Sequence, residues 1–579
     1  MENIVHQVDF CVVGGGIAGM CAAISAARHG AKTLLMHERP VLGGNASSEI
    51  RMWICGAYRT PETGILEEML LENLHRNNPF NYSVWDSVLY QLVQYQENLT
   101  LLLNCSCMEA KMSSDGKKIQ SVKGWQMTTQ QFHTVEAKIF ADCSGDSILA
   151  PLTGAACRWG REAKNEFNEA FGPEEADRKT MGMTCMIQAR ETDKVQKFVA
   201  PEWAMKFPDE SAFKCRGHEL SGLQNFWYLE LGGEQDTIRD TETLREELLR
   251  LAFGVWDHIK NHGDHGAEKW VLEWVGFLPG KRESRRYEGK YMMTERDITS
   301  GGKFDDMVAF GGWTMDDHPP KGFRNFGQPT THYPVPSPFG IPYRALYARD
   351  IENLMFAGRN ISVSHAAMSA TRVMATCALV GQAVGTAAAI AVANDLTPDG
   401  VYRSKITQLQ RTLMNDDCYL PGIKRAIAPA SLAAKLSSSN GGDPEAVRNG
   451  VDRQLGEVMN CWSGKTGDYL EYDFAAEQRS GKVRLILDSN IYRVRLNSLA
   501  IYPLAEDEER KFVTPKTMIN NFTISGCGAD GVWKEMYKIS GNYQRLVSLP
   551  LTFPVRKLRF TIDDVTDGKN VFAFELAEA

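Results

Sequence analysis

The sequence lacks an excess of positive charge, because 64 lysine and arginine residues face 72 aspartate and glutamate residues and leave a net charge of -8. Such a chain has no general attraction to a polyanion, which argues against nucleic acid or an acidic membrane as the main partner. The 13 cysteines are an odd number, scattered from Cys11 to Cys527 without the paired spacings of a zinc ribbon or finger. We therefore expect reduced, mostly buried thiols.

The first residues also lack a signal-peptide pattern. The segment MENIVHQVDFCVVGGG has no basic stretch followed by a hydrophobic run and a small-residue cleavage site, so we expect a cytoplasmic protein. One uncharged stretch, residues 373–393, is long enough to cross a bilayer. Small residues and Gln outnumber large aliphatic residues in it, which favours a helix packed closely against protein. We expect a buried helix and no membrane partner.

A strand, a glycine-rich turn and a helix follow one another at the N-terminus. The run VDFCVV, residues 8–13, precedes Gly14, Gly16 and Gly19, which stand in G-x-G-x-x-G spacing. Gly14 permits a tight turn, Gly16 lets the backbone approach a pyrophosphate, and Gly19 allows close packing of helix on strand. A second strand is expected to end at Glu38, whose carboxylate can accept hydrogen bonds from ribose hydroxyls. This order predicts a dinucleotide site.

Three further segments extend the predicted cofactor site. The loop ERPVLGGNASSE follows the second strand at once, and a pure NAD module does not need such a loop. KIFADCSGD and NLMFAGRN each read as a strand that ends in a glycine turn. The candidate cofactor residues in these segments are Arg39, Gly44, Asn45, Ser47, Ser48, Gly145, Asp146, Gly358, Arg359 and Asn360.

Taken together, GGGIAG, GGNASS, DCSGD, PGKRESRR and AGRNISVSHAAMSATRVMATCALVGQA resemble the FAD-dependent oxidoreductases of the FAD_oxidored type, over about residues 5–395. The resemblance implies noncovalent FAD in a fold of the glutathione-reductase type and redox chemistry on a small organic substrate. Arg359 stands where an aspartate is commoner, which is a departure at the contact to the ribityl chain. A helix that begins near Ala370 or Thr371 would direct its positive end toward reduced flavin.

The expected fold class is α/β with several domains. A Rossmann-like FAD-binding domain of the glutathione-reductase type covers residues 1–160 and 336–398, and an inserted α+β cap domain for substrate covers 161–335. Six tryptophans of the cap (Trp203, Trp227, Trp256, Trp270, Trp274 and Trp313) either stack on sugar faces or fill a core.

A helical linker, residues 399–430, leads to short alternating strands over 431–579, which predict an all-β sandwich. This part resembles a discoidin or galactose-binding-like module. Trp462, Tyr469 and Asp452 could line a sugar site there, and the alternative is a structural buttress or an oligomer contact. Since the flavin motifs all lie upstream, we expect a chain cut near residue 430 to fold and keep FAD.

Three residues are candidates for catalysis. His365 precedes the uncharged helix and could accept a proton from a substrate hydroxyl or amine, the alternative being a core histidine bonded to the backbone. Arg285, in the basic run PGKRESRRYEGK that alternates like a strand, could anchor substrate oxygens, the alternative being a solvated turn. Arg51 is a comparable candidate for anchoring substrate or acting as an electrophile.

One segment resembles a metal site. DHIKNHGDH places His258 and His262 four residues apart, with His265 close behind. It lacks the glutamate of H-E-x-x-H, and its polar neighbours favour a solvated helix end, so we expect no metal.

The sequence as a whole predicts an FAD-dependent oxidoreductase that transfers a hydride from a small polar substrate, a carbohydrate or glycoside, to the flavin. Two alternatives remain at this point, a reductase or dehydrogenase for a carboxylate substrate and a carbohydrate-binding protein with a non-catalytic flavin. The sequence is also compatible with a homo-oligomer.

Overall fold

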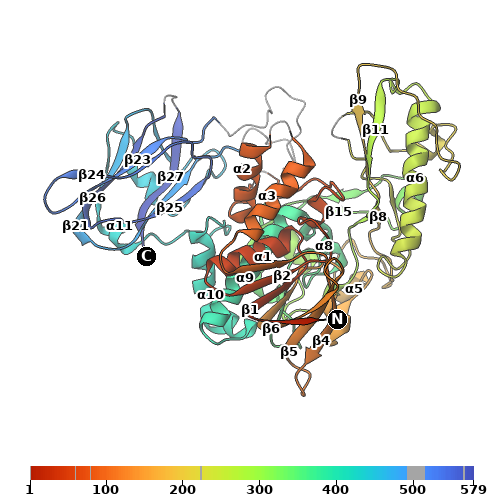
Figure 1. Cartoon of the computed structure of the whole chain (residues 1–579), viewed down its shortest axis with the longest axis horizontal. Helices are drawn as coiled ribbons and strands as arrows, with labels where there is room; N and C mark the ends of the chain where they lie inside the picture. Colours follow the sequence, from red (N-terminus) through yellow and green to blue (C-terminus); the bar gives the residue numbers. More distant parts are fainter. Residues whose placement is uncertain are drawn as a thin grey trace. The chain divides into compact units, whose positions relative to one another are not determined.

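The computed structural model describes residues 2–58, 60–77, 80–221, 224–491, 516–564 and 568–578, and Figure 1 shows the course of the chain. The chain divides into two compact units. Unit 1 contains Met1–Ile65 and Pro79–Leu409, and unit 2 contains Leu66–Asn78, Gln410–Asn497 and Phe512–Ala579. The regions expected as FAD-binding domain and cap therefore fall in one unit, except for Leu66–Asn78.

Unit 1 is built on a seven-stranded sheet of order β3-β2-β1-β6-β5-β4, in which β18 also pairs with β6. Its strands are β1 (Asn3–Val13), β2 (Thr33–Met36), β3 (Leu99–Leu102), β4 (Cys105–Met112), β5 (Ile119–Gln126), β6 (Gln131–Asp142) and β18 (Leu354–Phe356). The pairs that join β3, β2, β1, β6 and β18 are parallel, and β4 and β5 are antiparallel. Because parallel strands are covered on both faces, β2 and the end of β1 are continuous apolar runs.

The register of these strands brings the glycine turns together. Val13 stands opposite Asp142 in the β1–β6 pair, and Asp142 stands opposite Phe356 in the β6–β18 pair. The three strands therefore end at one edge of the sheet. In an open parallel sheet, ligands bind at the carboxyl ends of the strands.

The helix expected over residues 373–393 is confirmed as buried. It is α9 (Met374–Ala393), the one described helix that is long and apolar enough to cross a membrane, and 94% of its apolar window lies inside the protein. It packs on α1 (Ile17–Arg28) so closely that a Cβ at Gly381 would lie 2.1 Å from the carbonyl oxygen of Ala18. The expected start near Ala370 is wrong, because a separate helix, α8 (His365–Thr371), ends there and α9 begins only at Met374. The helix α3 (Tyr82–Gln94) contacts β3 and α1.

The middle of unit 1 mixes α-helices with short strands, as expected for the inserted region. It contains α4 (Leu149–Thr153), β7 (Cys157–Arg158), α5 (Lys164–Phe167), β8 (Met183–Thr184), β9 (Ile187–Glu191), η2 (Glu210–Phe213), β10 (Glu230–Leu231), α6 (Thr241–Asn261), β11 (Trp270–Val275), β12 (Gly280–Lys281), β13 (Arg286–Tyr287), α7 (Glu295–Thr299), β14 (Met307–Gly311), β15 (Met315–Asp317), η3 (Gly322–Arg324), β16 (Thr331–Tyr333), β17 (Phe339–Pro342) and η4 (Tyr343–Ala345). The buried side of α6 follows helical spacing, with Leu244, Leu248, Leu251 and Val255, and Trp256 is a core residue.

Unit 2 is an all-β sandwich with short helices, and the expected C-terminal β region is confirmed. One sheet has the order β19-β21-β26-β23-β24 and the other β20-β27-β22-β25. The elements are α10 (Pro398–Asn415), which begins in unit 1, α11 (Pro429–Ala433), β19 (Lys435–Ser438), η5 (Pro444–Arg448), β20 (Trp462–Gly464), β21 (Tyr469–Gln478), β22 (Lys482–Leu487), β23 (Phe522–Cys527), β24 (Trp533–Ile539), β25 (Leu546–Pro550), β26 (Val555–Ile562) and β27 (Lys569–Ala577). Buried residues alternate along β21 and β26, as expected where one face of each strand packs on the core.

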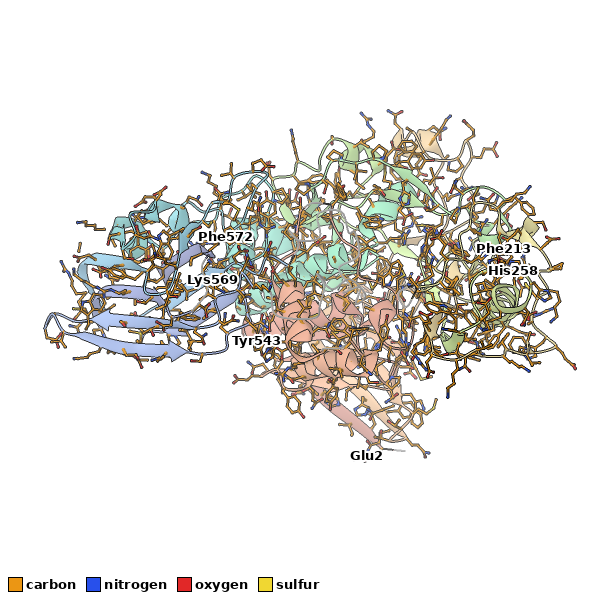
Figure 2. All side chains as sticks on the ribbon, turned by 90° about the horizontal axis from the view of Figure 1, so that it is seen from above. Glu2, Phe213, His258, Tyr543, Lys569 and Phe572 are labelled. Atoms are coloured by element: carbon orange, nitrogen blue, oxygen red, sulfur yellow. The ribbon has the colours of Figure 1, made fainter. Side chains whose placement is uncertain are left out.

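One helix of the N-terminal sequence belongs to unit 2. The helix α2 (Ile65–Arg76) buries Glu67, which accepts a hydrogen bond from Ser489 and lies 3.7 Å from the guanidinium of Arg545. The ring of His75 stacks on Tyr543, labelled in Figure 2, at 3.8 Å between centroids. These partners lie more than 400 residues away in the sequence, so the local pattern placed α2 with the FAD-binding region.

Candidate active site

The glycine motif turns from β1 into α1 as the sequence predicts. Gly14 has φ of 107°, and a Cβ on it would lie 2.5 Å from the backbone of Cys143. A Cβ on Gly19 would lie 1.9 Å from the carbonyl oxygen of Gly14. Gly16, the N-cap of α1, has no side-chain cap, and a Cβ there would have Gly44 Cα as its nearest neighbour at 3.9 Å. The backbone N–H groups of the first helical turn are thus available to an anion.

The second glycine loop lies against the first. Gly43 donates its backbone N–H to Gly15 at 2.9 Å and forms a bridge with Gly16. Ser47 donates its hydroxyl to the carbonyl of Gly44 at 2.7 Å, and the backbone N–H of Ser48 donates to Asp86 at 3.0 Å. The Ser47 hydroxyl therefore stabilises the loop by binding the loop's backbone. Asn45 donates to the carbonyl of Lys281 at 3.1 Å and links the loop to β12.

Glu38 follows β2 at the same edge of the sheet. Burial would raise its pKa, but the hydrogen bond and charge of His37, together with Arg39, outweigh burial and lower the pKa of Glu38 to about 2. Its carboxylate is ionised at neutral pH and accepts hydrogen bonds, as a ribose contact requires. Arg39 lies 3.6 Å from Glu38 and 3.4 Å from Glu49.

The turns after β6 and β18 are joined by an ion pair. Arg359 donates to Asp146 at 2.7 Å, and Lys281 donates to the other oxygen of Asp146 at 2.7 Å. Burial raises the pKa of Asp146, but the two cations outweigh it and hold that pKa well below its usual range. Gly145 and Gly358 both have positive φ, 77° and 113°. Asn360 is fully buried beside Asp142.

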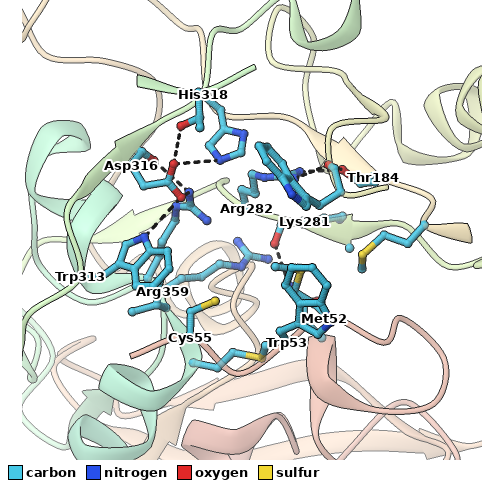
Figure 3. Close-up of a pocket in the computed structure, with 18 of the residues that line it drawn as sticks. Met52, Trp53, Cys55, Thr184, Lys281, Arg282, Trp313, Asp316, His318 and Arg359 are labelled. Atoms are coloured by element: carbon cyan, nitrogen blue, oxygen red, sulfur yellow. Dashed lines mark hydrogen bonds and ion pairs between the residues drawn. The ribbon is translucent and has the colours of Figure 1, made fainter. Parts of the chain in front are cut away.

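A cavity of 280 Å³ adjoins these segments (Figure 3). Its lining includes Asn45, Lys281 and Arg359 of the predicted cofactor set, and Val373 and Met374 at the start of α9. The expected approach of the positive end of this helix to the site therefore applies to α9. The cavity also has three tryptophan walls, Trp53, Trp227 and Trp313.

The charged groups of the cavity are paired with carboxylates. Arg282 lies 3.4 Å from Glu230, and Arg372 lies 3.0 Å from Asp316. His318 bonds through Nδ1 to Glu230 at 2.6 Å, and its Nε2 lies 3.4 Å from Asp316. Burial raises the pKa of both carboxyl groups, but these cations outweigh it and lower the pKa of Glu230 and of Asp316 below the usual range. Both acids are therefore ionised at neutral pH.

Cys55 is the cysteine in the cavity lining. Burial raises its pKa to about 12, with Asp316 adding to the effect. Its sulfur is therefore a thiol at neutral pH and not a nucleophilic thiolate. All 13 cysteines of the chain are free, as their scattered positions suggest.

His365 lies in an environment that differs from that expected of a general base. Its Nδ1 lies 2.9 Å from Glu283 and its Nε2 lies 3.2 Å from Asp317. Burial lowers its pKa, but Glu283 and Asp317 outweigh burial and raise the pKa to about 10. The ring is an imidazolium at neutral pH with both nitrogens engaged, so it has no lone pair to take a proton. The structure does not support the predicted role for His365.

The two candidate arginines do not line the cavity. Arg285 donates to the backbone carbonyl of Ser147 at 3.2 Å, and the expected strand around it is only the short β12 and β13. Arg51 lies between two aromatic rings, 4.5 Å from the centroid of Tyr82 and 4.4 Å from that of Trp274. Arg282 and Trp53, which stand near Arg285 and Arg51 in the sequence, line the cavity instead.

Sequence reasoning missed His318, Arg282 and Arg372 as candidates. Arg282 lies in the basic run PGKRESRRYEGK. The alternation expected of a strand does not show that Arg282, and not Arg285, lies on the cavity side. His318 stands in WTMDDHPP, which matches no catalytic motif. Its partner Glu230 lies 88 residues earlier.

The interpretation of DHIKNHGDH as a solvated helix end is wrong for His258. This side chain is fully buried, whereas His262 is 42% exposed and pairs with Asp257 at 3.5 Å. His258 instead bonds through Nε2 to Glu210 at 3.1 Å. That partner lies 48 residues earlier, beyond the range of a local motif.

Two of the three sugar-site candidates of the sandwich, Trp462 and Asp452, are held by other residues of unit 2. Trp462 is buried and donates its indole N–H to Asn440 at 3.1 Å. Asp452 is bound by Arg425 at 2.6 Å and by Arg484 at 3.1 Å. Both residues serve the core of unit 2.

A sheet edge with two glycine loops, an ionised acid after β2 and an adjoining cavity defines a dinucleotide-dependent enzyme. A family model described as FAD dependent oxidoreductase matches residues 9–413. The chain belongs to this family and is an FAD-dependent oxidoreductase. The residues present fit FAD, because the glycine cradle excludes side chains beside the uncapped N-terminus of α1 and because Glu38 is ionised.

Similarity to solved structures is low. A geranylgeranyl bacteriochlorophyll reductase-like protein from Thermoplasma acidophilum is 14% identical over 72% of this chain and 84% of that one, with a TM-score of 0.34. A family 32 carbohydrate-binding module from Streptococcus pneumoniae EndoD is 16% identical over 25% of this chain and 96% of the module, with a TM-score of 0.19. The family 32 module of Clostridium perfringens NanJ, solved with galactose, is 10% identical over 26% and 97%, with a TM-score of 0.18. At these identities and TM-scores, none of the three similarities supports an argument about this chain. No curated protein matches it.

Proposed function

We propose that the enzyme oxidises a small neutral polar substrate, a carbohydrate or glycoside, in the cavity beside the cofactor segments. The observation that carries the proposal is the lining of that cavity. Three tryptophans offer flat apolar faces, and His318 offers a polar group beside them. Sugars present both an apolar ring face and hydroxyl groups. The volume of 280 Å³ is at the lower end of ligand pockets and suits one small ring.

The pairing of charges at Arg282 and Arg372 favours a neutral substrate over a carboxylate on that side of the cavity. Glu230 and Asp316 balance Arg282 and Arg372, whereas Lys281 and Arg359 share the single carboxylate of Asp146. Arg282 also donates to Thr184 and to the carbonyl of Trp227, both at 2.8 Å, so its fork is engaged. A substrate carboxylate would have to compete with these acids.

We place FAD on the cradle of Gly14, Gly16, Gly19 and Gly44, with Glu38 on the ribose, in the manner of the glutathione-reductase type. FAD bound there supplies the acceptor for a hydride. Asn45, which follows Gly44 of this cradle in the sequence, lines the cavity together with Lys281 and Arg359, so a substrate in the cavity lies next to the cofactor segments.

His318 is the residue best placed to take the substrate proton. Because the carboxylate of Glu230 only accepts, Nδ1 of His318 carries a hydrogen, and in the deprotonated form of the ring Nε2 would hold the lone pair that takes the substrate proton. Protonation of Nε2 would be stabilised by Asp316, 3.4 Å away. The imidazole thus has one partner that fixes its tautomer and a second that stabilises the charge it acquires.

The test compares His318→Gln with the exposed control His262→Gln. Both variants are expected to keep FAD, and His318→Gln should slow anaerobic flavin reduction by the substrate by about 10²–10⁴-fold, as loss of a positioned base does. An unchanged rate would remove His318 from the reaction. Reduction by carboxylates but not by neutral sugars would contradict the proposed substrate class and support the alternative.

A further inference from the structure

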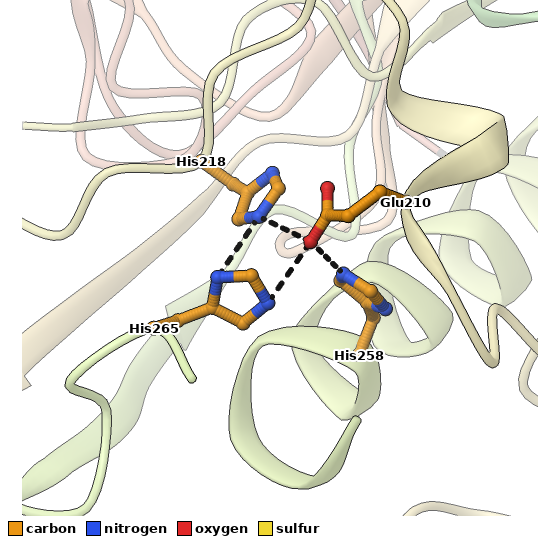
Figure 4. Close-up of side chains that lie close together, drawn as sticks. All are labelled: Glu210, His218, His258 and His265. Carbon is orange, nitrogen blue, oxygen red and sulfur yellow. Dashed lines mark hydrogen bonds and ion pairs between the residues drawn. The ribbon is translucent and has the colours of Figure 1, made fainter. Parts of the chain in front are cut away.

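Three histidines and one glutamate converge in the middle of unit 1, outside the cavity lining (Figure 4). Glu210 begins η2, His218 follows in the next loop, His258 lies in the last turn of α6, and His265 lies in the turn after that helix. Each residue offers one ligand atom, and the four atoms lie within 4.8 Å of one another.

The distances from Glu210 to the three histidines are close to the edges of a tetrahedral metal site. Glu210 Oε1 lies 3.1 Å from His258 Nε2, 3.3 Å from His265 Nε2 and 3.5 Å from His218 Nε2. Zinc with bonds of about 2.0–2.2 Å requires ligand atoms roughly 3.3–3.6 Å apart. His265 can also use Nδ1, which lies 3.1 Å from His218 Nε2.

Hydrogen bonds orient the ligand atoms toward one another. The Nδ1 of His258 donates to the backbone carbonyl of Phe207 at 2.8 Å, so Nε2 is the ring atom directed at Glu210. A backbone carbonyl on the second nitrogen is also the usual support of a metal-binding histidine. The Nε2 of His265 is buried and makes no hydrogen bond, although Glu210 is near.

The backbone leaves room for this arrangement. A Cβ on Gly263 would lie 2.3 Å from His265 Nε2, so only glycine lets the imidazole fold back toward α6. The ring of Phe213 stacks on His258 at 4.5 Å between centroids, and Figure 2 shows the two residues beside each other. His258 is fully buried, whereas Glu210 is 60% exposed and opens the site to solvent. A metal therefore has an entry path on the side of Glu210.

We propose that Glu210, His218, His258 and His265 bind one Zn²⁺ in a closed, four-coordinate site. Four protein ligands leave no open position, which is typical of structural zinc. The metal fastens the segment from Glu210 to His218 onto the C-terminal end of α6. The metal then holds together three imidazoles whose ring centroids lie 4.4–5.4 Å apart.

The experiment uses the tag-free full-length protein, freed of metal with a chelator and then titrated with ZnCl₂ against a chromogenic chelator. The wild type should bind one Zn²⁺ per chain, and Zn²⁺ should raise its melting temperature. His265→Gln and His218→Gln should weaken binding on the order of 100-fold or more, since even loss of an outer partner costs about 10–100-fold. His262→Gln, on the same turn but paired with Asp257, is the matched control and should bind as the wild type does.

FAD content reports whether each variant folds, and CoCl₂ tests the wild type without any variant. Bound Co²⁺ should give the intense visible absorption of a tetrahedral site. Failure of the folded wild type to bind Zn²⁺, a weak six-coordinate cobalt spectrum, or equal loss of affinity in His262→Gln and His265→Gln would each overturn the proposal.

Discussion

Gly16→Ala separates FAD binding from folding. The added Cβ meets no atom of the protein closer than Gly44 Cα at 3.9 Å, and the backbone at Gly16 has φ of -67°, which alanine adopts freely. The apoprotein should therefore fold as the wild type does. In contrast, Gly19→Ala would place a methyl group 1.9 Å from the carbonyl oxygen of Gly14 and should unfold the motif itself.

The methyl group at Gly16 instead occupies the space beside the N-terminus of α1 into which the pyrophosphate would come. Overpacking of a close contact costs about 1–3 kcal/mol, which corresponds to roughly 5- to 150-fold weaker FAD binding. The assay is FAD titration of the apoprotein, with thermal unfolding of the apoprotein as the measure of folding. Gly528→Ala in unit 2, whose Cβ would meet Asp530 at an ordinary 3.4 Å, is the control. Wild-type FAD affinity in a folded Gly16→Ala protein would refute the placement of the pyrophosphate.

Two further predictions concern stability. His365→Gln removes the cation that joins Glu283 and Asp317, although Arg286 remains 3.5 Å from Glu283, and should cost about 3–5 kcal/mol. Because the pKa of His365 is raised from about 6.5 unfolded to about 10 folded, its contribution is complete below pH 6.5 and is lost as the pH rises toward 10. The wild type and the variant should therefore converge in urea unfolding over that range, and a constant difference would contradict the ion pairs. Deleting the chain after residue 430 removes Arg545 from the buried Glu67 of α2. The yield of soluble, FAD-loaded protein should fall, contrary to the expectation from the sequence. A soluble yellow product would show that α2 does not need the C-terminal strands.

The parts of the fold that could be predicted from the sequence are those determined by local spacing. Gly14, Gly16 and Gly19 act within one strand-turn-helix unit, so their roles follow from their positions in the chain. The close packing of α9 followed likewise from its small residues, which allow Gly381 to approach Ala18.

The remaining features depend on partners that are distant in the sequence. His365 begins α8, and its pKa is raised by Glu283, 82 residues away. His258 and His265 were visible as a local pattern, while Glu210 and His218 join them only in the folded chain. No periodicity within α2 reveals that its buried Glu67 faces the C-terminal sandwich. In each case a charge or lone pair is interpreted correctly only when the group opposite it is known.

Anaerobic mixing of the FAD-loaded protein with a panel of neutral sugars, glycosides and carboxylates tests the central claim most directly. The account predicts that a neutral sugar or glycoside bleaches the flavin absorbance at a rate that saturates with its concentration, and that Trp227→Ala, which removes one wall of the cavity, raises the concentration needed for half saturation. Bleaching by none of the neutral compounds, or a half-saturation concentration that does not change in Trp227→Ala, would contradict the account.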